Sequence, residues 1–293
     1  MKGISQTMRR MARWITPHGL VEAHHRKLQA QERKRLEEVR LQEVGDSGRK
    51  ALSRNADLKG ALDGRRCFIL GNGPSLNELD LTRIFGEVTF VVNLFHRSPL
   101  LDRWSPTYWV GVDPKIKEIA SDPWVQEFVS GVSERVRAKS YFVPVQARQA
   151  LEESGVFAGK DLRYLYQRGD VDPTVEGFEL DLTRPLPSCQ TTPVMCIQLA
   201  MYMGASEIYL IGMDHDWLKY GQEGYRHFFP PQPGDTGVGD WPYDKLASAV
   251  VRMWEGYRRQ RTYAERHGIR IYNATKGGFL DVFERVDYDS LFS

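Results

Sequence analysis

Residues 67–76 read Cys-Phe-Ile-Leu-Gly-Asn-Gly-Pro-Ser-Leu, an apolar run that ends in a glycine-rich turn. The four apolar residues 67–70 predict a buried strand. The Gly-Asn-Gly turn at 71–73 tolerates the left-handed backbone angles and the close approach of neighbouring chain that a sharp turn requires. The stretch therefore predicts a strand that ends in a tight turn.

The residues after this turn have the features of a helix start. Pro74 suits the first turn of a helix, and Ser75 and Glu78 have the spacing of a capping box. A helix that begins at the carboxyl end of a strand is a common anion site, because its free N–H groups and its dipole point there. The turn has two interpretations, a phosphate-binding site and an ordinary strand-to-helix connection made for packing.

Length, charge and cysteine content exclude several classes of protein. The chain has 293 residues, 41% of them hydrophobic, enough for one large α/β domain with an appendage. Its net charge of +2 gives no sign of a nucleic-acid partner. The three cysteines, Cys67, Cys189 and Cys196, have no zinc-site spacing, and we expect reduced thiols. With no secretory signal or apolar run of about 20 residues, we expect a cytoplasmic protein.

Residues 1–60 differ in composition from the rest and predict a basic helical extension and linker before a domain at 61–293. Residues 1–50 hold twelve Lys or Arg against six Asp or Glu. Apolar residues recur at roughly helical spacing among the first fifteen, and residues 45–64 have the composition of a linker. A basic amphipathic helix fits peripheral contact with the inner face of the cell membrane, self-association, or a solvated helix.

Predicted strands and helices alternate from residue 65 onward. The strand candidates are residues 67–70, 88–92, 108–112, 141–143, 162–166, 208–211 and 269–272. The helical patterns between them cover residues 76–84, 115–129, 146–154, 192–203 and 243–267. This alternation predicts an α/β fold with a Rossmann-like, mostly parallel sheet and helices on both faces.

Polar residues follow several of the predicted strands. Asn93 follows the second strand, Asp113 the third, and Asp214 and Asp216 the late strand at 208–211. Because parallel strands end along one edge of a sheet, we expect these side chains to gather there. They would offer partners for a base, a ribose or a metal ion, although Asp113 also has the position of a helix N-cap.

Two threonines precede the most apolar predicted helix. Either Thr191 or Thr192 suits the N-cap position, which leaves the other for a ligand. This second helix N-terminus would add to the capacity of the site to hold an anion.

The motifs, taken in order, resemble a known group of enzymes. The matching residues are Gly71, Asn72, Gly73, Pro74, Ser75 and Leu76, the strand end at Asn93, and residues 191–196, 206–214, 272–278 and 286–287. They resemble the MptE-like family, which contains 6-hydroxymethylpterin diphosphokinases and the central domain of motility accessory factors. They also resemble the related CMP-sialic-acid sialyltransferases of glycosyltransferase family 42. The resemblance covers about residues 65–290 and implies a GT-A-like variant of the Rossmann fold.

The sialyltransferase resemblance also implies roles for single residues. It implies that residues 71–73 line the nucleotide phosphate and sugar and that Asn93 hydrogen-bonds the donor. It implies that Thr191 and Thr192 approach the cytidine or the carboxylate. Asp113 stands where those enzymes have an asparagine, so an acceptor replaces a group that can also donate.

A cluster of polar and ring side chains follows the late strand. His227 is the favoured general base and His215 the second choice, because histidine accepts protons near neutral pH. Tyr225 is suited to stabilise a leaving phosphate, and Asp214 completes the expected catalytic set. The Pro- and Gly-rich segment 228–242 predicts a lid.

Together these features predict a glycosyltransferase of surface polysaccharide biosynthesis. It would move a sugar from a nucleotide-activated donor, with a CMP-linked nonulosonic acid favoured, to a hydroxyl of a glycan or lipid-linked acceptor with inversion, without a required cofactor. One alternative is an ATP- and Mg-dependent diphosphokinase acting on a pterin-like alcohol, with Asp214 and Asp216 near the metal. Another is a non-catalytic partner protein that keeps the fold.

Overall fold

The computed structural model describes residues 31–32, 35–220, 227–230 and 241–293. The chain divides into two units, Met1–Asp46 and Ser47–Ser293. Residues 35–43 of the first unit are helical, and Leu36 and Val39 are exposed there. The basic amphipathic helix expected over the first fifteen residues lies outside the described part of the chain, so its membrane contact or self-association stays a prediction.

The stretch 45–64, which has a linker-like composition, begins with two helices. It forms α2 (Gly45–Ser53) and then a 3-10 helix (Arg54–Leu58). Leu52 is fully buried. The Asn55 side chain donates to two backbone carbonyl groups, 2.8 and 3.0 Å away, that lie 109 and 127 positions further along the chain. Residues 47–64 of this stretch belong to the second unit, in which Asn55 is buried while most of its polar neighbours are exposed.

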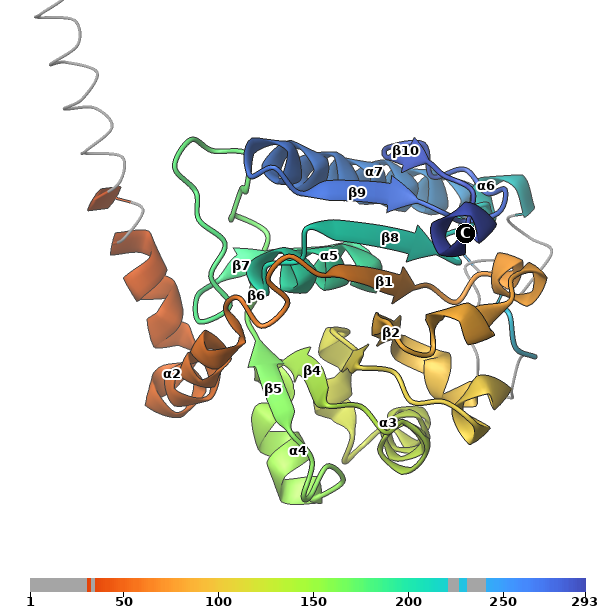
Figure 1. Cartoon of the computed structure of the whole chain (residues 1–293). Helices are drawn as coiled ribbons and strands as arrows, with labels where there is room; N and C mark the ends of the chain where they lie inside the picture. The colour runs from red at the N-terminus through yellow and green to blue at the C-terminus, as the bar shows by residue number, and fades with distance from the viewer. Residues whose placement is uncertain (1–30, 33–34, 221–226, 231–240) are drawn as a thin grey trace, which may run out of the picture. The chain divides into compact units, whose positions relative to one another are not determined.

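Eight strands form one parallel sheet in the second unit (Figure 1). The order is β10-β9-β8-β1-β2-β3-β4-β5. The strands are β1 (Arg66–Leu70), β2 (Val88–Val92), β3 (Tyr108–Val110), β4 (Ser140–Pro144), β5 (Leu162–Leu165), β8 (Glu207–Ile211), β9 (Arg270–Asn273) and β10 (Glu284–Arg285). A separate parallel pair joins β6 (Gln167–Arg168) and β7 (Leu186–Pro187). All seven predicted strands are present.

The strand order changes direction at β1. Strands β2 to β5 follow β1 towards one edge in chain order, whereas β8, β9 and β10 lie on its other side. Leu70 at the end of β1 pairs with Val91 of β2 and with Ile211 of β8. The chain after β1 and the chain after β8 therefore lead to strands on opposite sides of β1, and such a change of direction is where open α/β sheets bind ligands.

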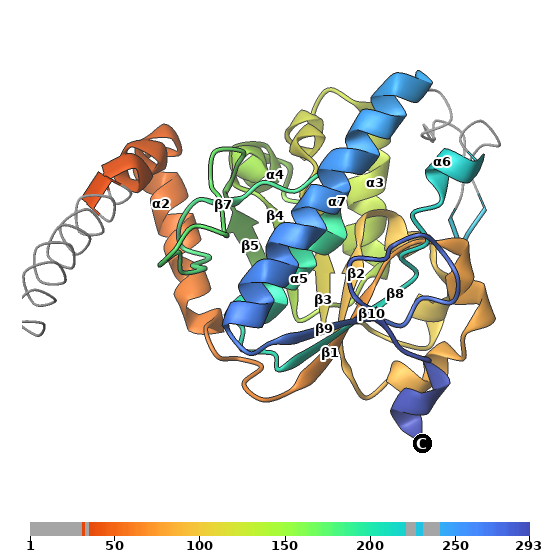
Figure 2. The same ribbon diagram turned by 90° about the horizontal axis from the view of Figure 1, so that it is seen from above.

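Helices cover both faces of the sheet, as the alternation of elements predicts. On one face α5 (Thr192–Tyr202) and α7 (Tyr243–Arg266) run side by side and share a buried core with the strands (Figure 2). On the other face Trp109 of β3 packs against Phe128 of α3 (Pro123–Arg135). The described part of this unit also contains the short helices α4 (Arg148–Ser154) and α6 (Trp217–Tyr220). Among the described residues, no helix has the length and apolarity needed to cross a membrane.

Two predicted helices are interrupted by aspartate caps. The expected helix at 76–84 consists of two 3-10 helices (Pro74–Glu78 and Leu81–Ile84), because Asp80 caps a new start with its side chain. The expected helix at 115–129 is divided in the same way. There the Asp122 carboxylate accepts two backbone N–H groups at the start of α3, at 2.9 and 3.2 Å.

Candidate functional site

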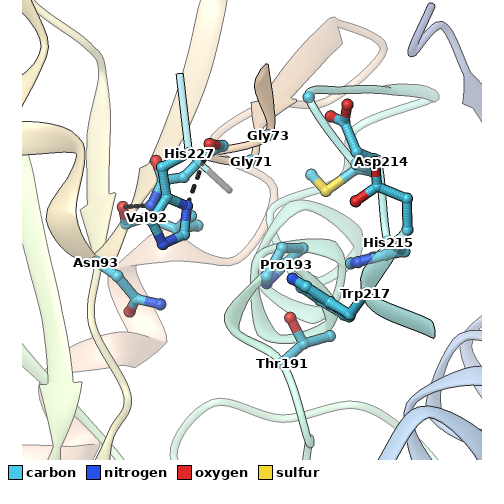
Figure 3. A pocket seen from close by; sticks show the side chains of 14 residues that line it. Gly71, Gly73, Val92, Asn93, Thr191, Pro193, Asp214, His215, Trp217 and His227 are labelled. Atoms are coloured by element: carbon cyan, nitrogen blue, oxygen red, sulfur yellow. Dashed lines mark hydrogen bonds between the residues drawn. The ribbon is translucent and has the colours of Figure 1, made fainter. Parts of the chain in front are cut away.

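Three adjoining pockets lie at the carboxyl ends of the strands. The first, which we call the central pocket, has a volume of about 110 Å³. It is lined by Gly71, Asn72, Gly73, Val92, Asn93, Thr191, Pro193, Gly212, Met213, Asp214, His215, Asp216, Trp217 and His227 (Figure 3). The α7 pocket, of about 400 Å³, and the α3 pocket, of about 140 Å³, are named after the helices that line them. Asn93 borders all three pockets.

These pockets bring together the site residues expected from the sequence. Every one of them borders at least one pocket, except Tyr225, which lies outside the described residues. Asp113 borders the α7 and α3 pockets, and Thr192 borders the α7 pocket. The expectation that polar strand ends meet along one edge of the sheet is confirmed.

In the turn after β1, the backbone N–H groups of the two glycines donate hydrogen bonds to other parts of the protein. Gly71 donates to a carbonyl of β8 at 2.8 Å, and Gly73 donates to the carbonyl of Gly212 at 3.0 Å. A Cβ atom at Gly71 would lie 2.3 Å from the Gly212 oxygen. The two glycines therefore allow two loops to approach closely, which is the packing interpretation of this turn.

Ser75 binds an aspartate and does not form a capping box with Glu78. Its backbone N–H and its hydroxyl both donate to the buried carboxylate of Asp214, at 3.2 and 2.7 Å. Glu78 instead forms an ion pair with Lys276 at 3.1 Å. The capping-box prediction is wrong, because the backbone N–H and the hydroxyl of Ser75 bind the Asp214 carboxylate, which belongs to the loop after β8.

The carboxylates considered for magnesium are both buried. Asp214 and Asp216 are each 8% exposed, and the two oxygens of Asp214 accept the hydrogen bonds from Ser75. No cluster of three or more His, Cys, Asp and Glu side chains with metal-binding geometry occurs within the described ranges. The observed contacts of Asp214 fix the turn after β1 to the loop after β8.

Asn93 adopts a left-handed backbone conformation with φ of 46°. Its side-chain oxygen accepts a hydrogen bond from the Thr192 hydroxyl at 3.0 Å, and its backbone carbonyl accepts one from the Trp109 indole at 3.0 Å. The side-chain amino group consequently faces the central pocket (Figure 3). It is placed to donate to an oxygen of a ligand.

His227 is oriented by the backbone of Asn72. Its Nδ1 atom lies 3.2 Å from the Asn72 carbonyl oxygen, and its ring stacks on Phe229 with centroids 5.3 Å apart. A carbonyl oxygen can only accept, so Nδ1 carries the proton of the neutral ring and Nε2 carries the lone pair. This tautomer suits a general base at the border of the central and α3 pockets.

His215 is buried among aromatic rings and is a weaker candidate for the base. The Tyr257 hydroxyl lies 2.7 Å from its Nε2, and the Trp217 ring lies 4.9 Å away between centroids. Burial lowers the pKa of His215 to about 3 and raises the pKa of Tyr257 well above its usual value. The hydrogen-bond partner of His215 is thus a hydroxyl, and the His215 ring packs beside Trp217 at the pocket wall.

Asp113 and Thr191 occupy the helix starts expected for them. Asp113 accepts the backbone N–H of Lys115 at 2.8 Å, which confirms its capping position, while it also borders two pockets. Thr191 is the N-cap residue of α5, but its side chain makes no capping hydrogen bond. It borders the central and α7 pockets.

Sequence reasoning missed the tryptophans of the site. Trp217 borders the central and α7 pockets, Trp241 borders the α7 pocket, and Trp124 borders the α3 pocket. The position of Trp217, three residues after Asp214 at a strand end, was the available signal. Trp124 gave a weaker one, since it follows a capping aspartate in a predicted helix.

Comparisons with known proteins found similar solved structures. No family model matches the chain, and no curated protein sequence matches it. The MAf glycosyltransferase from Magnetospirillum magneticum AMB-1 superposes with a TM-score of 0.48 at 16% sequence identity. The match covers 83% of this chain and 38% of that protein, so this chain matches less than half of its length.

Proposed function

We propose that this protein is a glycosyltransferase that moves a sugar from a nucleotide-activated donor to an acceptor hydroxyl. The orientation of His227 by the Asn72 carbonyl is the observation that carries the proposal. His227 and Asn93 border the same pocket, at the strand ends where α/β sheets bind ligands, which supports a base and an amide donor acting together. A CMP-linked nonulosonic acid is the favoured donor, on the resemblance of the sequence motifs, and a glycan or a lipid-linked sugar is the favoured acceptor.

In the proposed reaction, Nε2 of His227 takes the proton of the acceptor hydroxyl as the acceptor oxygen bonds to the anomeric carbon of the donor. The bond between that carbon and the phosphate oxygen breaks, and its electron pair leaves with the nucleoside monophosphate. Attack opposite the leaving group inverts the anomeric centre. We assign the Asn93 amino group and the N-terminus of α5 the role of stabilising the negative charge on the departing phosphate, since Asn93 and Thr191 border the central pocket.

The α7 pocket has the size and lining for the nucleoside. Its volume of about 400 Å³ falls in the range of small-molecule sites. Trp217 and Met253 supply apolar wall, and Asp113 and Gln190 supply hydrogen-bonding groups. We place the base and ribose there and the phosphate and donor sugar in the central pocket.

A thermal-shift screen tests this proposal. We expect CMP to raise the melting temperature more than UDP, GDP or ATP, with or without magnesium, because a ligand that binds only the folded state stabilises it. CMP-N-acetylneuraminate should then be hydrolysed slowly, with water as the acceptor. Stabilisation by ATP and magnesium alone would support the diphosphokinase instead. An absence of stabilisation by every nucleotide would favour a non-catalytic partner protein.

A further inference from the structure

The α3 pocket lies beside the proposed base and has no role in the donor site described above. It has a volume of about 140 Å³, and Asn72, Asn93 and His227 border both it and the central pocket. Its lining also includes Trp124 and Phe128 of α3, whose rings stack with centroids 5.5 Å apart. A ligand in this pocket would therefore meet both the proposed base and an aromatic surface.

Two residues of this pocket carry buried polar atoms with no hydrogen-bond partner among the described residues. They are the side-chain oxygen of Asn72 and the indole Nε1 of Trp124. The first can only accept a hydrogen bond and the second can only donate one. Buried polar atoms are nearly always paired, and a buried indole N–H usually finds a partner. A hydroxyl group can donate or accept, so a ligand that bears several hydroxyl groups can supply a partner to each of these two atoms.

Size and charge narrow the class of ligand further. A cavity of about 150 Å³ accommodates one six-membered carbon ring, which is close to the volume of this pocket. Lys115 borders the pocket, but its ammonium group is paired with Asp122 at 2.7 Å, so its charge is already balanced. The Asp113 carboxylate also borders the pocket and disfavours an anionic ligand, so the pocket fits a single ring that bears hydroxyl groups and no negative charge.

We propose that the α3 pocket is the acceptor subsite and that it holds one sugar ring that bears no negative charge. The ring packs against Trp124 and Phe128, and its hydroxyl groups bind the Trp124 indole N–H and the Asn72 oxygen. The reacting hydroxyl points to His227. The donor lies in the central pocket, which His227 also borders. This assignment rests on the proposed glycosyltransferase function and names the class of its acceptor.

Direct binding of simple glycosides tests the assignment without any donor. We would record saturation-transfer NMR of the full chain with the methyl glycosides of glucose, galactose, N-acetylglucosamine and N-acetylgalactosamine. At least one should bind the wild type. Trp124→Phe keeps an aromatic ring and removes the N–H donor, and it should weaken that binding by about three- to tenfold. The rise in melting temperature caused by CMP should not change in this variant.

A matched substitution controls for the loss of an indole. Trp104 packs against Phe85 and Phe95 and borders none of the three pockets. Trp104→Phe should leave glycoside binding unchanged. The assignment is overturned if no methyl glycoside binds the wild type, or if Trp124→Phe binds as tightly as the wild type. Failure of every nucleotide to bind would refute the donor site alone, because glycoside binding is measured without it.

Discussion

Ser75 donates two hydrogen bonds to the carboxylate of Asp214, one from its backbone N–H and one from its hydroxyl. The two residues are 139 positions apart, and the contact joins the loop after β1 to the loop after β8. Gly73 makes room for it, since a Cβ atom there would lie 1.8 Å from an Asp214 oxygen. One wall of the central pocket depends on this contact.

Removal of the Ser75 hydroxyl should destabilise the protein. In Ser75→Ala the buried carboxylate of Asp214 loses its shorter hydrogen bond, and bonds to charged groups contribute about 1.5–3 kcal/mol. Urea unfolding should show a loss of that size. The exposed Ser121, changed to Ala, should lose less than about 0.5 kcal/mol. Equal stability of the two variants would contradict the importance of the contact.

The turn after β1 should not tolerate a methyl group at Gly71. The added Cβ would meet the backbone oxygen of Gly212 at 2.3 Å, and two backbone segments cannot separate without breaking their hydrogen bonds. We expect Gly71→Ala to cost about 3 kcal/mol or more of unfolding free energy, or to prevent folding. At Gly86 a Cβ would meet no atom within 4 Å, so Gly86→Ala serves as the control. It should melt within a few degrees of the wild type, and similar melting of both variants would argue against the clash.

Loss of the His227 imidazole should reduce turnover while nucleotide binding remains. We expect His227→Ala to lower kcat by about 10²- to 10⁴-fold, the usual contribution of a general base. The rise in melting temperature with CMP should persist. His267 is exposed and distant from His227 in the sequence. His267→Ala is the control and should retain full activity. Full activity of His227→Ala would remove this residue from the mechanism.

Asn93→Asp should weaken binding of the donor. The aspartate can still accept from Thr192 and tolerates the left-handed backbone, but it cannot donate and adds a negative charge beside the proposed phosphate position. We expect binding of CMP, measured by calorimetry, to weaken about tenfold or more. Gln126→Glu makes the same chemical change on an exposed part of α3 and should bind CMP normally. Normal binding by Asn93→Asp would place the phosphate elsewhere.

Burial of neutral His215 should make the protein less stable in mild acid. Its folded pKa of about 3 lies below the ordinary value of 6.5, so the unfolded chain binds the proton first as the pH falls. This stabilising contribution is complete above about pH 6.5 and is lost towards pH 3, at about 1.4 kcal/mol per pH unit.

His215→Asn removes the titrating group and keeps a residue suited to the positive φ of 47°. Between pH 7.5 and 5.0 its unfolding free energy should fall by about 2 kcal/mol less than that of the wild type. Urea unfolding at the two pH values measures the difference, with His267→Asn as the control. Parallel losses in wild type and His215→Asn would show that this histidine is protonated in the folded protein.

The sheet could be predicted because its strands are apolar runs bounded by turn residues. Strand β2 was predicted with its observed limits. The sequence indicated that the strands run mostly parallel. It did not give their order in the sheet, because a pattern of apolar runs does not say which strand lies beside β1. The short strands β6, β7 and β10 have two residues each, too few to produce a pattern.

Site residues that directly follow strands could be predicted from the sequence. Hydrogen-bond partners that are distant in the sequence could not. Asn93 and Asp214 could be placed at one edge because parallel strands end together. Local spacing paired Ser75 with Glu78, whereas the structure pairs it with a residue 139 positions away. The same limit applies to His215, whose partner Tyr257 is 42 positions further along.

The position of β1 between β2 and β8 also determines when the site can form during synthesis. Strands β1 to β5 leave the ribosome first, and the chain must add α5 before β8 can close the open side of β1. Until then β1 has an unpaired edge, which other chains could extend. The nascent protein thus cannot hold a ligand between β1 and β8 before residue 211 is made. Ligand binding therefore reports that β8 has paired with β1.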